Sequence, residues 1–327
     1  MQRDHCPCGR AQYDGALEIR CLADLHASRP AGLRYLDPAS VAATLKSLNH
    51  SRTLVTTVQG DSLSCARPHR IRWGTAALDS HPATECLALQ LADTAPATVA
   101  YTPTSGLHDD LDVLHFFGHT GALQFRVALN DLALGLALDA LPDSVPASPD
   151  GPLSAHDNNV HSLTATLALK RRWHTGGAAW HLAQFQQATS ADRLRALPLL
   201  GVERARPVSP LVIPSWLEHM REMGMAYWRL MVGDMSTQAD GSVVTGLAVQ
   251  SSHVLLQSRL GLSVLDLNNI GSCWETRFTD GDRDVTFIEL YSAQGTCLAV
   301  MAPYREHGLH YWRSVTNSLP GRVSRTA

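Results

Sequence analysis

Residues 111–127 read LDVLHFFGHTGALQFRV, which is the pattern of two β-strands joined by a glycine turn. Side chains of the first strand alternate between two faces, and Gly121 lies at the chain reversal. The pattern returns without a gap as VTFIELYSAQGTCLAVM in residues 285–301, where Gly295 takes the place of Gly121. Because the offset between the two copies is close to half of the 327 residues, it indicates a duplicated domain.

The duplication divides the chain into two repeats of similar design. We expect an irregular N-terminal lead-in at residues 1–30, a first repeat at 31–142, a linker at 143–159, a second repeat at 160–320 and a disordered tail at 321–327. The linker is inferred from its content of Pro, Ser and Asp. The predicted fold class is α+β, a tandem structural repeat in which each half is a large antiparallel sheet flanked by helices.

Helical patterns flank the strand-like runs of both repeats. Asp37 can cap the first predicted helix, and Pro38 suits its first turn. Apolar spacing and helix stop signals define the others. The predicted helices cover residues 38–49, 131–141, 163–173, 191–197, 214–223 and 311–319.

The composition is that of a globular protein, with 45% hydrophobic and 17% charged residues. A net charge of −3 gives no electrostatic reason to expect nucleic acid or an acidic membrane as a partner. No apolar run approaches the ~20 residues that a membrane helix needs, and the start MQRDHCPCGR lacks the apolar segment of a signal peptide. Seven mostly scattered cysteines fit reduced thiols. We therefore expect a cytoplasmic protein that is not a membrane protein and binds no nucleic acid.

One motif offers a serine hydrolase as a weaker alternative. Residues 60–63 spell GDSL, the nucleophile block of the GDSL esterases, and Asp112 with His115 resembles their Asp/His pair. A nucleophilic serine needs a histidine base within hydrogen-bond reach and a carboxylate that orients this base. Turn chemistry alone explains the Gly-Asp pair. Aligning the Gly-Asp turns of the two repeats puts Met235 opposite Ser62, which counts against a catalytic serine.

Two groups of residues have a superficial likeness to metal sites. The thiols of Cys6, Cys8 and Cys21 do not follow a usual zinc spacing, so chance thiols in the lead-in are favoured. His115 and His119 are four residues apart, but one lies in the predicted strand and the other in the turn, so they need not converge.

The second repeat carries a series of segments with a parallel in a known family. They are WETR at 274–277, VTFIELYSAQG at 285–295, Arg305, and WR at 312–313. They resemble the C-terminal repeat of the HemS/HmuS/ChuS family of cytoplasmic haem-handling proteins, in which a Trp-x-x-Arg strand, a VTSLELFDAxG hairpin, a Gly-x-Arg segment and a Trp-Arg helix follow one another. In the first repeat, LHFFGHTGALQFRV looks like the family's FFDAxGxxxHKV hairpin.

This resemblance implies a haem-binding protein. Members of the family receive haem (iron protoporphyrin IX) from an importer at the inner membrane and pass it on, and several are reported to cleave it with a reductant. The implied function is haem uptake, trafficking or use as an iron source, and the sequence does not separate a carrier from a haem-degrading enzyme, because the cofactor supplies the oxidative chemistry in either case. The alternative is a degenerate module that no longer binds haem and serves a binding or regulatory role, since a fold does not fix a function.

The resemblance also implies an axial histidine in the second repeat, with haem between the helices and the sheet of that half. In the family this histidine lies in a His-Gln-Phe segment. Counting forward from Trp173 places the ligand within one residue of His181, whereas counting back from the GVER stretch at 201–204 places it on Ala191. We take His181 as the candidate iron ligand, and the alternative register stays open.

The remaining candidate haem-binding residues are cationic or phenolic. Arg204 and Arg305 match family arginines that face the haem propionates, and Arg277 belongs to the matching strand. Tyr304 is close to the position of a family tyrosine and is a candidate substitute for it. Phe278 replaces a family lysine, so we expect a cation-poor pocket that holds the propionates weakly.

Overall fold

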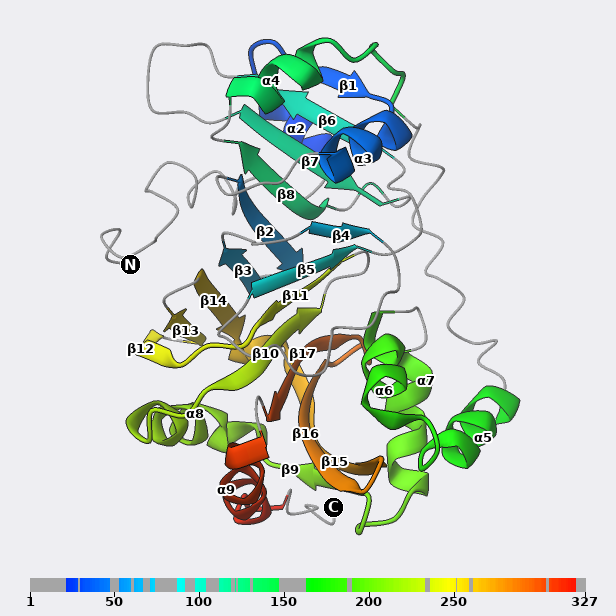
Figure 1. The fold of residues 1–327 in the computed structure, drawn as a ribbon, viewed down its shortest axis with the longest axis vertical. Helices are drawn as coiled ribbons and strands as arrows, with labels where there is room; N and C mark the ends of the chain where they lie inside the picture. The colour runs from blue at the N-terminus through cyan, green and yellow to red at the C-terminus, as the bar shows by residue number, and fades with distance from the viewer. Residues whose placement is uncertain are drawn as a thin grey trace.

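Two large β-sheets form the body of the molecule, and helices cover them (Figure 1). The structure is a computed structural model. It describes residues 22–28, 30–47, 53–59, 62–66, 71–73, 87–91, 98–103, 112–118, 121, 123–129, 132–146, 163–186, 190–232, 236–250, 252–258, 261–303 and 306–321. Most of the predicted linker and tail therefore lies outside the described residues.

Within these ranges, one sheet has nine strands and the other has eight, and all neighbours are antiparallel except one pair. The order of the first sheet is β1 (Arg34–Leu36), β6 (Thr98–Thr102), β7 (Asp112–Phe117), β8 (Leu123–Leu129), β2 (Thr53–Gln59), β3 (Ser62–Ala66), β14 (Gly261–Asp266), β13 (His253–Ser258) and β12 (Val244–Gln250). The order of the second is β4 (Ile71–Trp73), which runs parallel to β5 (Leu87–Leu91), then β11 (Ser236–Asp240), β10 (Tyr227–Val232), β17 (Cys297–Pro303), β16 (Arg283–Ser292), β15 (Ile270–Asp280) and β9 (Ala205–Val208).

The two sheets repeat one another in register, at the offset that the sequence predicts. Phe116 pairs with Phe125 in the β7–β8 hairpin, and Leu290 pairs with Ala299 in the β16–β17 hairpin. Each hairpin has a register shift at the residue that follows, so even the irregularity is repeated. The predicted α+β tandem repeat of antiparallel sheets is confirmed.

The turn glycines of these hairpins are required by the backbone conformation. Gly121 and Gly295 have φ angles of 74° and 87°. Residues with a Cβ atom rarely adopt this left-handed backbone conformation, whereas glycine adopts it without steric cost. The glycine that first revealed the duplication therefore marks a shared turn geometry.

Each sheet is completed by strands from the other half of the chain. Ala66 of β3 pairs with Gly261 of β14, and Asp240 of β11 pairs with Leu87 of β5. The second pair is the equivalent of the first one with the two halves exchanged, so the halves are related by an approximate two-fold axis. The repeats predicted from the sequence thus share both sheets.

The same register corrects one alignment made from the sequence. Val55 pairs with Ala66 between β2 and β3, and Arg229 pairs with Asp240 between β10 and β11, so the offset of the two hairpins holds here as well. Ser62 therefore corresponds to Ser236. Matching the Gly-Asp turns had put Met235 at this place, one residue out of register.

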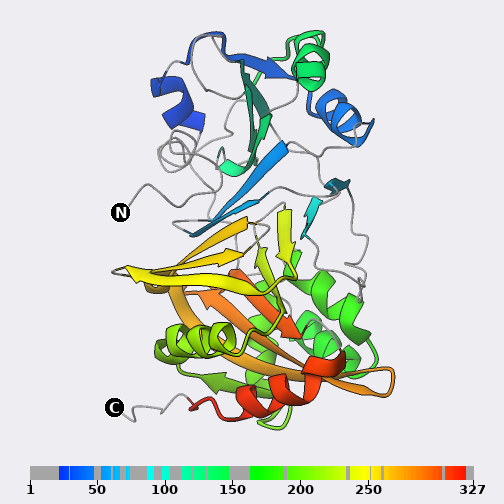
Figure 2. The same ribbon diagram turned by 60° about the vertical axis from the view of Figure 1, so that its left-hand side comes forward.

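Helices lie on both faces of the second sheet (Figures 1 and 2). The face that carries Phe278 and Phe287 packs against helices of residues 163–196, and we call it the α5–α7 face. The face that carries Ile288 and Leu290 packs against two other helices, and we call it the α8–α9 face. The helices are α2 (Leu22–Ser28), α3 (Pro38–Ser47), α4 (Leu132–Asp139), α5 (Leu163–Arg172), α6 (Gly177–Gln186), α7 (Ser190–Ala196), α8 (Ile213–Glu222) and α9 (Glu306–Asn317), with 3₁₀ turns η3 (Leu197–Leu199), η4 (Pro210–Val212) and η5 (Leu267–Asn269).

Helix α2 lies in the lead-in that the sequence predicted to be irregular, and for residues 22–28 that prediction was wrong. Leu22 and Leu25 are buried in one cluster with Phe117 and Leu123 of the first sheet. Tertiary packing therefore stabilises a helix that is too short to be stable by itself.

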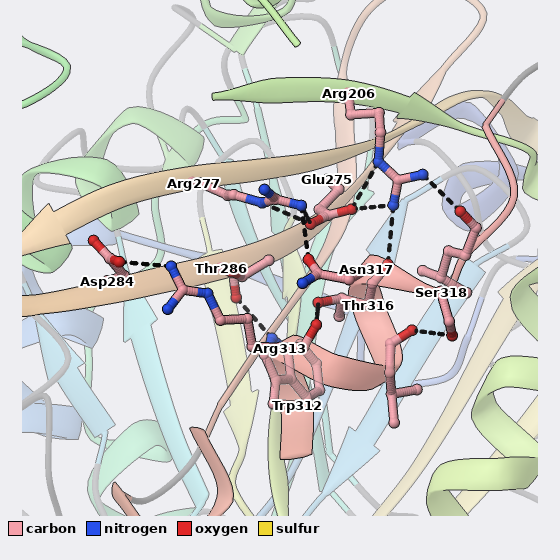
Figure 3. Close-up of polar contacts among 12 residues, drawn as sticks. Arg206, Glu275, Arg277, Asp284, Thr286, Trp312, Arg313, Thr316, Asn317 and Ser318 are labelled. Carbon is pink, nitrogen blue, oxygen red and sulfur yellow. Dashed lines mark hydrogen bonds and ion pairs between the residues drawn. The ribbon is translucent and has the colours of Figure 1, made fainter. Parts of the chain in front are cut away.

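The carboxylate of Glu275 ties the C-terminal helix to the α8–α9 face (Figure 3). The Glu275 side chain is fully buried and accepts hydrogen bonds from Arg206 and Arg277. Arg206 also donates to the carbonyl oxygen of Leu319 at 2.6 Å, and Arg277 donates to Asn317 at 2.7 Å. The end of α9 is thereby held by the sheet beneath it.

In the first half of the chain, an arginine of the edge strand likewise holds the end of the last helix. Arg34 of β1 donates to the carbonyl oxygen of Leu141 at 2.7 Å, just beyond α4, as Arg206 of β9 donates to Leu319 beyond α9. The duplication therefore extends to the outermost strand and the last helix of each half.

Candidate functional site

A polar cluster of His181, Arg193 and Glu289 is buried beneath α5–α7. Helix α6 carries His181, α7 carries Arg193 and β16 carries Glu289. The side chains of Arg193 and Glu289 are 0% exposed. Arg193 donates to Glu289 from Nη2 to Oε1 at 2.5 Å and from Nε to Oε2 at 3.0 Å. This two-pronged ion pair neutralises a charge that would otherwise be costly to bury.

Two hydroxyl groups complete the hydrogen bonding of Glu289. Thr276 donates from Oγ1 to Oε1, and Tyr291 donates from its hydroxyl to Oε2 at 2.6 Å. Burial and the charge of Glu289 raise the pKa of Tyr291 well above its ordinary value. The phenol therefore keeps the proton that it donates.

Aromatic rings surround the buried charges. The Arg193 guanidinium lies 4.5 Å from the ring centres of both Trp173 and Phe185, within the range of cation–π attraction. The His181 ring stacks on Phe278 with 3.8 Å between ring centres. The space between α6 and the sheet is therefore filled by aromatic side chains.

Both ring nitrogens of His181 are engaged. Its Nε2 lies 3.0 Å from the carbonyl oxygen of Trp173, which can only accept, so Nε2 carries the proton. Its Nδ1 lies 3.0 Å from Nη1 of Arg193, which can only donate, so Nδ1 supplies the lone pair. Burial above all, and then the charge of Arg193, lower the pKa of His181 to about 2. His181 is therefore a neutral imidazole in a defined tautomer.

Helix α6 brings His181 to this place, although the sequence did not predict this helix. Gly177 starts it with a φ of 66°, and the backbone N–H of Ala178 donates to the Asp280 carboxylate at 3.1 Å. Asp280 ends strand β15, which comes much later in the chain, so the cap is formed by tertiary structure. Local sequence does not contain that signal.

The structure does not bring Arg277 to His181. Alternate residues of β15 point to opposite faces, and the Arg277 side chain lies on the α8–α9 face with Glu275 and Asn317 (Figure 3). Arg204 is half-buried in the turn before β9, where its carbonyl oxygen accepts the backbone N–H of Arg277 at 2.7 Å.

Most of the other predicted site residues are not among those that the structure describes. Tyr304 and Arg305 lie outside the described residues. Ala191, the alternative ligand position, lies in the first turn of helix α7 and has no side-chain atom that can bind a metal. The thiols of Cys6, Cys8 and Cys21 and the ring of His119 also lie outside the described part of the chain.

Sequence reasoning missed Arg193 as a site residue and gave Glu289 no role beyond the hairpin match. The available signal was the position of Arg193 three and four residues before the buried Ala196 and Leu197, on the apolar side of α7. An arginine at such a position needs a buried anion.

The geometry does not support the serine hydrolase. Ser62 lies on β3 and His115 on β7, with β8 and β2 between them, which separates them by about 14 Å. Asp112 and His115 point to opposite faces of β7, and Asp112 accepts a hydrogen bond from the Tyr101 hydroxyl at 3.0 Å. Ser62, His115 and Asp112 therefore do not form a catalytic triad.

His115 should instead make stability depend on pH. It is 2% exposed, and burial first and the Arg126 charge second lower its pKa to about 3. As the pH falls below about 6.5, the unfolded chain takes up a proton here that the folded chain refuses, so stability is lost between pH 6.5 and 3. Between pH 7.5 and 5 this loss is about 2 kcal/mol.

Urea unfolding at both pH values measures this contribution. The fall in unfolding free energy should be about 2 kcal/mol smaller in His115→Gln than in the wild type. The exposed His310, changed to Gln, serves as the control and should keep the wild-type fall. An equal fall in wild type and His115→Gln would contradict the prediction.

Among the residues that the structure describes, no group of three or more His, Cys, Asp or Glu side chains is placed to hold a metal ion. No helix in the described ranges has both the length and the apolar character needed to cross a bilayer.

The fold is that of two helix-flanked antiparallel sheets built from tandem repeats that exchange strands, and solved haem proteins share it. Apo-PhuS, a heme-binding protein from Pseudomonas aeruginosa, is 18% identical and aligns over 96% of this chain and 95% of its own with a TM-score of 0.71. ChuS, an E. coli heme oxygenase, is 19% identical and aligns over 94% of this chain and 95% of its own with a TM-score of 0.69. No family model and no curated protein matches the sequence. The resemblance to the HemS/HmuS/ChuS family is thus confirmed at the level of the fold.

Proposed function

We propose that this protein binds haem and serves haem uptake, trafficking or use as an iron source in the cytoplasm. The observation that carries the proposal is the similarity to PhuS and ChuS along nearly the whole chain, because one is described as heme-binding and the other as a heme oxygenase. An importer at the inner membrane is the expected haem donor. Haem would supply the iron and its redox chemistry, and the protein would supply a ligand, orientation and surroundings.

The described residues beneath α5–α7 offer two of the features that a haem site requires, an imidazole and apolar walls. Such a site needs an axial ligand, apolar walls and polar groups for the propionates. His181 is a neutral imidazole, and the rings of Trp173, Phe185 and Phe278 are the walls. Trp274 packs against the same cluster, and its buried indole N–H has no hydrogen-bond partner among the described residues.

We propose that His181 binds the iron and that Arg204 binds a propionate. Arg305 and Tyr304, which lie outside the described residues, stay predicted propionate partners from the sequence. Arg277 is less suited, because its side chain lies on the other face of the sheet. The neutral imidazole of His181 fits haem iron. In this structure, however, neither of its nitrogens can bind a metal, because both form hydrogen bonds. Binding therefore requires His181 to give up a hydrogen bond.

Titration of the purified protein with haemin tests the proposal. Wild type should give a saturable shift of the Soret band, and His181→Ala should bind at least tenfold more weakly, which corresponds to about 1.4 kcal/mol. His174→Ala is the matched control, since this histidine is exposed seven residues before His181. The absence of saturable binding in wild type would refute the function, and equal binding by His181→Ala would refute the site.

The same complex distinguishes a carrier from an enzyme. Incubation with ascorbate in the presence of catalase should leave the Soret band intact in a carrier. In a haem-degrading enzyme the band should disappear and a defined bilin should form.

A further inference from the structure

Arg193 occupies the lone pair of His181, the only free electron pair on the imidazole. Its Nη1 donates to Nδ1 of His181 at 3.0 Å, while its other two donor atoms hold Glu289. An imidazole that binds iron through one nitrogen carries a proton on the other. Iron binding through either nitrogen of His181 therefore affects the hydrogen bond from Arg193.

If iron binds Nδ1, it takes the lone pair that now accepts from Arg193. If iron binds Nε2, the proton moves to Nδ1, and two donors, the Nδ1–H and the Arg193 N–H, then face each other. In both cases the contact between Arg193 and His181 has to break. The ion pair of Arg193 with Glu289 is compatible with either outcome, because it uses Nε and Nη2.

We propose that Arg193 is a latch on the haem site, which keeps His181 closed to iron until the guanidinium releases Nδ1. This inference rests on the proposed haem-binding function and adds a step that controls the rate of loading. The latch is held by three elements at once, since α7 carries Arg193, α6 carries His181 and β16 carries Glu289. Because Arg193 and His181 are fully buried, water cannot replace the hydrogen bond between them.

The first test is the rate of haem association. Arg193→Met removes the donor, and the double variant Arg193→Met/Glu289→Gln also removes the carboxylate charge that the single variant leaves unpaired. Stopped-flow mixing with monomeric carbonmonoxy-haem should show association at least tenfold faster in both variants than in wild type. The control is Arg195→Met, on the same helix with a 48% exposed side chain, which should keep the wild-type rate.

The second test observes the latch without haem. In protein labelled with ¹⁵N-histidine, the wild-type His181 spectrum should show a protonated Nε2 and an unprotonated, hydrogen-bonded Nδ1. The double variant should lose the Nδ1 hydrogen-bond shift. A protonated Nδ1 in wild type would overturn the latch.

The outcomes separate the two proposals. If neither wild type nor the variants bind haem, the proposed function fails and the latch fails with it. If wild type binds at the rate of the two Arg193 variants, haem binding stands and the latch is refuted. Faster association that persists when His181→Ala is added to the double variant would also refute the latch, because the gain would then not act through His181.

Discussion

Glu289→Ala should lower the free energy of unfolding by about 3–5 kcal/mol, because it leaves the Arg193 guanidinium buried without a counter-ion. Thr276 and Tyr291 would lose their acceptor in the same step. Urea unfolding followed by circular dichroism measures this loss.

A double-mutant cycle separates the ion pair from the packing around it. Arg193→Met/Glu289→Gln should cost less than the sum of the two single changes, because neither buried charge remains. Additive losses would show that the pair contributes nothing beyond the packing of each side chain. The tenfold acceleration of haem loading expected for this double variant is measured independently of its stability.

Asp240→Ala should cost a similar amount, about 3–5 kcal/mol, on the opposite face of the second sheet. Asp240 forms an ion pair with the buried Arg229 at 2.9 Å and also accepts hydrogen bonds from Ser242 and Ser258. Because Asp240 pairs with Leu87 of the other half, its loss should also speed amide exchange in β5 and β11.

Matched variants show whether burial causes the effect. Asp240→Asn retains acceptor capacity but not the charge, and should cost less than Asp240→Ala. Asp284→Asn removes the partner of Arg313, where the side chains are 55% and 45% exposed, and should change stability by less than about 0.5 kcal/mol. A comparable loss at Asp284 would contradict the assignment of the cost to burial.

The repeat was visible in the sequence because it rests on local patterns. Strand alternation and a turn glycine are properties of short segments, and Gly121 and Gly295 preserve them at a constant offset. The exchange of strands was not visible, since the partner of Ala66 or Asp240 is chosen by the assembled sheet. The misalignment by one position at Ser62 had the same origin, because turn chemistry was used where pairing sets the register.

The candidate site was only partly predictable for a related reason. His181 was found through the resemblance and a residue count, whereas its partners Arg193 and Glu289 come from the next helix and from a strand near the end of the chain. Arg277 was grouped with His181 by its place in the motif, but alternation along β15 sends the Arg277 side chain to the other face. A strand motif shows which residues are neighbours in sequence, and the packing of α6 decides which of them share a site.

The exchanged strands have a consequence for any half-length form of this protein. In a single repeat, β3 would lose its partner β14, and β5 would lose its partner β11. Such unpaired strand edges favour pairing with another chain. Two identical half-chains could satisfy one another by reciprocal donation, as a mutually dependent dimer whose stability varies with concentration. Tandem fusion makes that encounter intramolecular, so the linkage between α4 and α5 replaces a concentration-dependent association by a fixed effective concentration.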